Sequence, residues 1–143
     1  MINFFKKFFK KKTNVEEKIS DTNLACALLL IEVSYSDFEV QNVEIEKIVN
    51  FFESDFGLSK EKAIWLNNEA QKLHKDTNCL RRYIKLINEK YTKKQKINLI
   101  NMAWQIARAD NFVDKYEEHR IRKLSELLYL KHSDFIKEKI RTK

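Results

Sequence analysis

A short acidic pattern that occurs twice constrains the fold of this chain more than any other feature. The pattern Asp-x-x-Val-x-x-x-Glu runs from Asp37 to Glu44 and again from Asp110 to Glu117, an offset of 73 residues. Each copy follows an apolar segment and precedes an amphipathic one, as expected for a turn between two helices. The repetition therefore predicts two helix–turn–helix units related by a pseudo-twofold axis, with the acidic turns at equivalent places.

The near absence of turn-forming residues points to an all-α protein. The 143 residues include one glycine and no proline, which sheets and longer loops normally use. With 43% hydrophobic and 34% charged residues, the chain is able to close a core, and its length suits one domain. We expect residues 19–143 to form a single-domain bundle of about seven helices.

Apolar spacing and capping residues set the expected helix boundaries. The first helix contains LACALLLIEV and is apolar nearly all round, which indicates a central buried helix. Gly57 is expected to end the second helix in a left-handed conformation, and Thr92 with Gln95 forms a capping box for the fifth. The expected helices span residues 19–36, 42–55, 59–75, 76 or 77 to 91, 92–110, 114–128 and from 133 onward.

The first twelve residues form a basic amphipathic segment. Its aromatic side chains fall on one half of a helical wheel and most of its lysines on the other, as in a helix that lies in an anionic membrane surface. We interpret residues 1–12 as a peripheral contact at the inner membrane face of a cytoplasmic protein. Docking onto a protein surface and a disordered tail are the alternatives, and the polar residues 13–18 are expected to act as a hinge. The expected contact residues are Phe4, Phe5, Phe8 and Phe9 on the apolar half, and Lys6, Lys7, Lys10 and Lys11 on the basic half.

At both acidic turns an apolar helix ends in small residues and an aspartate. The segments are ARADN at 107–111 and SYSDF at 34–38. Over residues 24–135 the chain resembles the TerB family of tellurite-resistance proteins, in which Ala-x-Ala-Asp-Gly, a β-branched residue and a glutamate follow one another twice. Asn111 and Phe38 replace the glycine of that pattern. The resemblance implies an all-helical bundle, a divalent-cation site at the acids, and roles linked to stress or membranes.

Five carboxylates of the two turns are candidate metal ligands. Such oxygen ligands suit Ca²⁺ or Mg²⁺ rather than softer metals, and a cation relieves the repulsion between carboxylates that converge. An EF-hand is excluded, because counting from Asp110 puts Phe112 and Ile121 where oxygen ligands are needed. Helix capping and solvated charge provide the alternative explanation of the same acids. The candidate ligands are Asp37, Glu44, Asp110, Asp114 and Glu117.

A second basic region, between residues 81 and 108, supports a rival function. Its cations, with Tyr83 and Tyr91 interleaved, are typical of a face that follows the phosphates of a nucleic acid. Alternatively the tyrosines point inward and the charges are a solvated face. We favour this alternative, because five lysines of residues 1–12 account for much of the formal charge of +7. The basic residues are Arg81, Arg82, Lys85, Lys90, Lys93, Lys94, Lys96 and Arg108.

Motifs of catalysis and of zinc binding are missing from the sequence. It has no glycine-rich phosphate loop, no nucleophile elbow, and no histidine spaced from a cysteine as in a zinc site. Cys26 and Cys79 lie in apolar helical patterns and are expected to be small buried residues in a reducing compartment. The leading hypothesis is a non-enzymatic, membrane-associated module that binds a divalent cation or a protein partner through the paired acidic turns and acts as a stress-response or adaptor protein. Nucleic-acid binding through residues 81–96 is the alternative.

Overall fold

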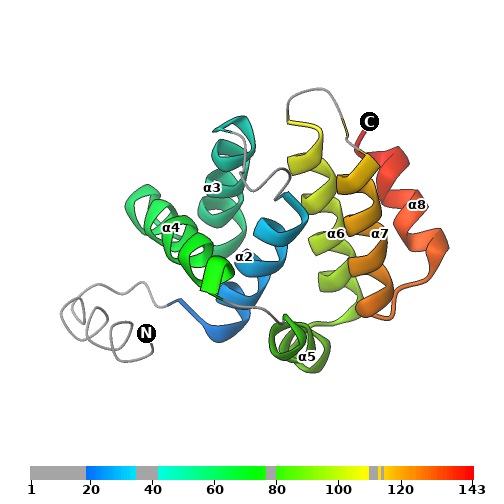
Figure 1. Cartoon of the computed structure of the whole chain (residues 1–143), viewed down its shortest axis with the longest axis horizontal. Helices are drawn as coiled ribbons and strands as arrows, with labels where there is room; N and C mark the ends of the chain where they lie inside the picture. The colour runs from blue at the N-terminus through cyan, green and yellow to red at the C-terminus, as the bar shows by residue number, and fades with distance from the viewer. Residues whose placement is uncertain (1–18, 35–41, 77–79, 110–112, 114) are drawn as a thin grey trace.

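Seven α-helices make up the described part of the chain, which contains no strand. The computed structural model describes residues 19–34, 42–76, 80–109, 113 and 115–143. The all-α bundle predicted from the sequence is confirmed. The helices are α2 (Asp21–Ser34), α3 (Asn42–Phe56), α4 (Lys60–Asp76), α5 (Arg81–Lys90), α6 (Lys93–Ala107), α7 (Lys115–Leu127) and α8 (His132–Arg141) (Figure 1).

Helix α2 is the centre of the bundle. It packs against α3, α4, α5, α6 and α7. Nine of its 14 residues are buried, so it presents no broad face to solvent. A helix that is apolar nearly all round has to be enclosed by other elements, and the run LACALLLIEV is enclosed in this way.

The helices repeat in their order and in their packing. The offset of 73 residues maps α2 onto α6, α3 onto α7 and α4 onto α8, whereas α5 connects the two sets. Within each set the third helix packs on the first two, while α3 also packs on α6 and α7 packs on α2. Figure 1 shows α3 and α4 on one side of the α2–α6 pair, and α7 and α8 on the other. This reciprocal packing is the pseudo-twofold arrangement that the duplicated turn predicts.

Two predicted helix ends are formed by local signals in the sequence. Gly57 has a φ of 67°, and the buried Leu58 behind it donates its backbone N–H to the Phe52 carbonyl at 3.4 Å. At the start of α6 the Thr92 hydroxyl accepts from the Gln95 backbone N–H at 3.2 Å. The Gln95 side chain in return accepts from the Thr92 N–H at 2.8 Å. Both the left-handed helix stop and the capping box are therefore confirmed.

Two other helix ends differ from the sequence prediction. Helix α5 begins at Arg81, later than expected, and its N-cap residue Leu80 has no side-chain acceptor with which to cap it. Helix α7 ends at Leu127, one residue earlier than expected, Tyr129 behind it has a φ of 60°, and the Leu130 N–H donates to the Ser125 carbonyl at 3.0 Å. This bond closes a Schellman-type turn, in which glycine usually occupies the left-handed position.

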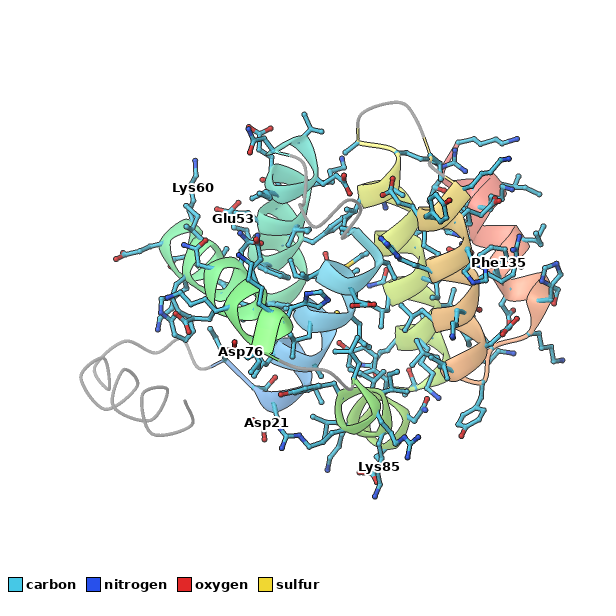
Figure 2. The ribbon with its side chains drawn as sticks, viewed as in Figure 1. Asp21, Glu53, Lys60, Asp76, Lys85 and Phe135 are labelled. Carbon is cyan, nitrogen blue, oxygen red and sulfur yellow. The ribbon has the colours of Figure 1, made fainter. Side chains whose placement is uncertain are left out.

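The core of the second half is built around Trp104. Its ring is fully buried, and its centroid lies 5.3 Å from that of Phe135, which projects from α8 toward α7 (Figure 2). The Arg108 guanidinium and the Lys139 ammonium lie 5.2 and 5.8 Å from the indole centroid. Among the described residues, the buried indole Nε1 has no hydrogen-bond acceptor. The tryptophan therefore contributes mainly packing and cation–π contacts.

Candidate functional site

Of the five candidate metal ligands, the structure describes Glu44 and Glu117. They are the third residues of α3 and α7, and they are 2% and 5% exposed. A carboxylate in the first turn of a helix is favoured by the helix dipole. Burial at both positions excludes a solvated surface charge for these two acids, and it makes their environments alike in the two halves.

The helix ends that flank the two acidic turns lie at the same end of the molecule. Figure 1 shows the beginnings of α3 and α7 at the end that the carboxyl termini of α2 and α6 also reach. Val113, the β-branched residue of the second motif, packs against the core. The remaining candidate ligands Asp37, Asp110 and Asp114 lie outside the described residues. Within the described ranges no three His, Cys, Asp or Glu side chains are grouped to hold a metal, so cation binding stays a prediction.

The predicted membrane segment also lies outside the described residues. These are residues 1–12, with the contact residues Phe4 to Lys11, and the hinge at residues 13–18. From residue 19 onward, no described helix is both long enough and apolar enough to cross a bilayer. Peripheral attachment through the first twelve residues is thus a prediction that only an experiment on the whole chain can test.

The basic face on α5 does not have free aromatic rings. Tyr83 is buried, and the Arg82 guanidinium donates to its hydroxyl at 3.0 Å while lying 5.1 Å from its ring centroid. Tyr91 is half-buried and packs against the core. Because base stacking needs an accessible ring, the buried Tyr83 is not available to a nucleic acid. The alternative explanation, in which the tyrosines point inward and the cations form a solvated face, therefore agrees with the structure. Nothing supports nucleic-acid binding.

Cys26 is a core residue. Complete burial raises the pKa of its thiol to about 12, and its side chain is hydrogen-bonded to Tyr91. A fully buried thiol with such a pKa stays protonated at neutral pH, which makes it a poor nucleophile. The expectation of a small buried residue is correct for Cys26, while Cys79 lies outside the described residues.

A hydrogen bond that the sequence did not reveal joins α2 to α4. The Nε2 atom of His74 is bonded to the Glu32 carboxylate, although the two residues are 42 positions apart. This bond is the main cause of a lowered Glu32 pKa, and the positive charge of Arg120 lowers it further. The signal for this contact was the single acid in the apolar run LLLIEV, because an acid on a buried helix needs a polar partner.

The fold and the duplicated turns define an internally repeated all-α module. Each half carries a buried glutamate in the first turn of its second helix. The chain belongs to the TerB family, since the family model described as tellurite resistance protein TerB matches residues 23–140. This match confirms the resemblance of the acidic turns. Comparisons with curated proteins and with solved structures gave no significant match.

Proposed function

We propose that this chain is a non-enzymatic TerB module that binds a divalent cation through its paired acidic turns. The observation that carries the proposal is the burial of Glu44 and Glu117 at equivalent places of the repeat. Several carboxylates that meet at one end of the repeat would repel each other, and a divalent cation would relieve that repulsion. Buried acids at both equivalent positions support one common binding site rather than two unrelated helix caps.

The ligands of the cation would come from both copies of the motif. Each copy supplies an aspartate at its first position and a glutamate seven residues later, and the second copy adds another aspartate. These carboxylates are hard oxygen donors, which favours Ca²⁺ or Mg²⁺ over Zn²⁺. The proposed ligands are Asp37, Glu44, Asp110, Asp114 and Glu117.

Thermal unfolding with and without added cations tests this site. A cation at a hundred times its dissociation constant stabilises the folded state by about 2.7 kcal/mol. We expect Ca²⁺ or Mg²⁺ to raise the Tm of the wild type and to have little effect on Asp110→Asn. Glu126→Gln is the matched control, because it removes an exposed acid of α7 outside the motif. Equal shifts in both variants, or no shift in the wild type, would remove the cation site from the proposal.

The second part of the proposal is that the module acts at an anionic membrane surface as an adaptor in a stress response. It rests on the aromatic and basic halves of residues 1–12 and on the TerB family. Co-sedimentation with vesicles containing phosphatidylserine should pellet the full chain, and chains lacking residues 2–12 should stay in the supernatant. Vesicles of phosphatidylcholine alone provide the control for charge. Equal pelleting of the two chains would contradict the membrane contact.

A further inference from the structure

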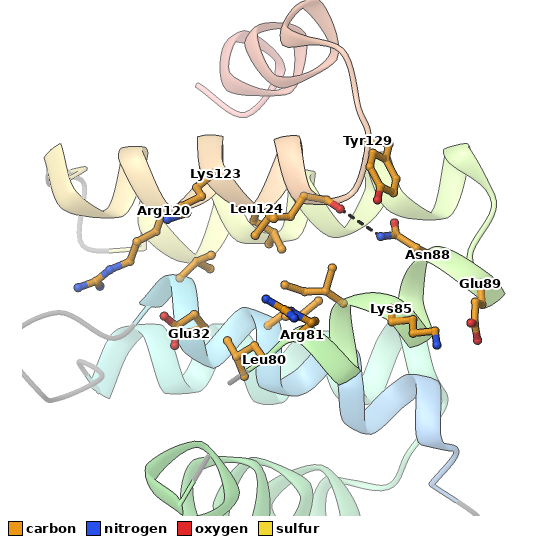
Figure 3. Close-up of a pocket in the computed structure, with 14 residues that line it drawn as sticks. Glu32, Leu80, Arg81, Lys85, Asn88, Glu89, Arg120, Lys123, Leu124 and Tyr129 are labelled. Atoms are coloured by element: carbon orange, nitrogen blue, oxygen red, sulfur yellow. Dashed lines mark hydrogen bonds between the residues drawn. The ribbon is translucent and has the colours of Figure 1, made fainter. Parts of the chain in front are cut away.

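A groove with a volume of about 840 Å³ lies between α2, α5 and α7. Figure 3 shows α7 along one side of it and α2 with α5 along the other. Its volume is in the range of clefts that bind ligands, and aliphatic side chains form much of its lining. The aliphatic lining residues are Leu29, Val33, Leu80, Ile84, Leu124 and Leu127.

The rim of this groove is predominantly basic. Four cationic residues and two acids line it, which leaves an excess of two positive charges. Among the described residues, the exposed Lys85 and Lys123 take part in no ion pair. One of the acids, Glu32, is already bonded to His74. The groove therefore favours a ligand that is apolar on one side and acidic on the other. The charged lining residues are Arg81, Lys85, Arg120, Lys123, Glu32 and Glu89.

Tyr129 supplies an exposed aromatic side chain at one end of the groove, where Figure 3 places it beside Asn88. The tyrosine is 83% exposed and has a φ of 60°. A left-handed backbone costs a residue with a side chain about 1–2 kcal/mol, and glycine would form the same turn without this cost. Such strain is often found where a side chain serves binding, and tyrosine is enriched at binding hot spots.

Asn88 closes the groove at the same end. Its Nδ2 donates to the Leu127 carbonyl at 3.1 Å, which fixes the amide across the groove (Figure 3). Its buried Oδ1 has no donor within the described part of the protein. Because this oxygen is shielded from solvent, Asn88 forms a fixed end of the groove, and the exposed ring of Tyr129 is the side chain that a ligand can contact there.

The dimensions of the groove match a short helix. Its α7 wall runs from Arg120 to Leu127, which at 1.5 Å per residue is about 10 Å, or two helical turns. An amphipathic helix that lies in a groove inserts side chains spaced i, i+3, i+4 and i+7, which covers the same length. The first twelve residues of this chain are a poor occupant, because their five lysines would meet the basic rim. We propose that the groove binds an acidic amphipathic helix of a partner protein.

The internal repeat supplies a control surface within the same molecule. A second groove of about 480 Å³ lies between α3 and α6, where Lys47 and Gln105 correspond to Arg120 and Glu32 of the first. Its lining is largely polar, and no counterpart of α5 forms a third wall. Lys47→Glu therefore reverses a charge at an equivalent position without touching the proposed binding site.

The test uses a fluorescently labelled synthetic peptide in which leucines at i, i+3, i+4 and i+7 alternate with glutamates. A scrambled peptide of the same composition is the control, and both are titrated into the full chain in EDTA without vesicles. Anisotropy should show salt-dependent binding of the patterned peptide. The double variant Lys85→Glu/Lys123→Glu should weaken it by roughly tenfold, and Lys47→Glu should leave it within about twofold. Backbone amide shifts in NMR should map to α2, α5 and α7.

Several outcomes would overturn this proposal. They are equal binding of the scrambled peptide, no weakening in the double variant, or amide shifts away from the groove. The absence of groove shifts at millimolar peptide would also count against it. Tighter binding of a peptide copied from residues 1–12 would assign the groove to the chain's own N-terminus. Because the assay contains neither divalent cation nor membrane, its result is independent of the function proposed above.

Discussion

Replacing Tyr129 by glycine and by alanine separates backbone strain from side-chain contact. The residue holds a φ of 60° and is 83% exposed. The ammonium of Lys96 lies 5.9 Å from the centroid of its ring. At an exposed site a cation–π contact of this kind contributes about 0.5 kcal/mol. Both substitutions remove this contact, but only glycine also removes the strain.

The expected difference in unfolding free energy between the two variants is the balance of two opposing contributions. Relieving the left-handed conformation at residue 129 gains about 1–2 kcal/mol for glycine. Glycine has greater conformational freedom in the unfolded chain, which lowers the stability of the glycine variant by about 0.5–1 kcal/mol. Tyr129→Gly should therefore be more stable than Tyr129→Ala by about 0.5–1 kcal/mol, or roughly 2–3 °C in Tm for a chain of this length. Inside an ordinary helix the alanine variant would instead be the more stable of the two.

Urea and thermal unfolding measure this difference in stability. Gly57 allows the opposite substitution, of a glycine by alanine at a left-handed position. Gly57 has a φ of 67°, and an added Cβ would meet no atom within 4 Å, so its cost is the backbone term alone. Gly57→Ala should destabilise the protein by about 1 kcal/mol. If Tyr129→Ala were as stable as Tyr129→Gly, residue 129 would not be held in a left-handed conformation. The strain argument would then fail.

Two further substitutions test the core and the link between α2 and α4. Trp104→Ala should cost about 3–5 kcal/mol in urea unfolding, whereas Trp104→Phe should cost less than about 2, because it also removes a buried N–H without an acceptor. Glu32→Gln should cost less than about 1 kcal/mol at neutral pH, since the Glu32 side chain is 44% exposed. Because the folded pKa of Glu32 is lowered, its contribution is complete above the ordinary value of 4.5 and is lost as the pH falls through the folded pKa. The difference in unfolding free energy between wild type and Glu32→Gln should thus shrink as the pH falls below 4.5, and a difference that stays constant through the acid titration of the folded protein would contradict the bond to His74.

Features encoded in a few neighbouring residues were predictable from the sequence. The run LACALLLIEV has no polar side, so its burial at the centre follows from composition alone. Gly57 and the Thr92–Gln95 pair act within one helical turn, and both form as predicted. The reciprocal packing of the two halves followed from an offset between motifs, which needs no knowledge of loop conformation.

Features that need distant segments to meet were not predictable in this way. The His74–Glu32 bond spans 42 residues, and each partner seen alone looks like an ordinary helix residue. Tyr129 violates local preference, since no sequence rule would place an aromatic residue at a left-handed helix end. Arg120 lines the groove between α2, α5 and α7 only because α7 packs against α2, a helix of the other half. Sequence patterns specify the faces of helices, but the crossing of those helices decides which faces share a groove.

The position of α5 explains why two equivalent halves do not form two equivalent sites. A perfect duplication would give the α2–α7 and α3–α6 grooves the same walls. Helix α5 connects the halves and packs on α2, so it adds Arg81, Ile84 and Lys85 to one groove, and the lining of the other contains no counterpart of α5. Such a difference allows one groove to bind a ligand that the other does not, whereas a pair of carboxylate turns that hold one ion would need no difference. The repeat therefore suits the proposed cation site, and the connecting helix suits the proposed partner groove.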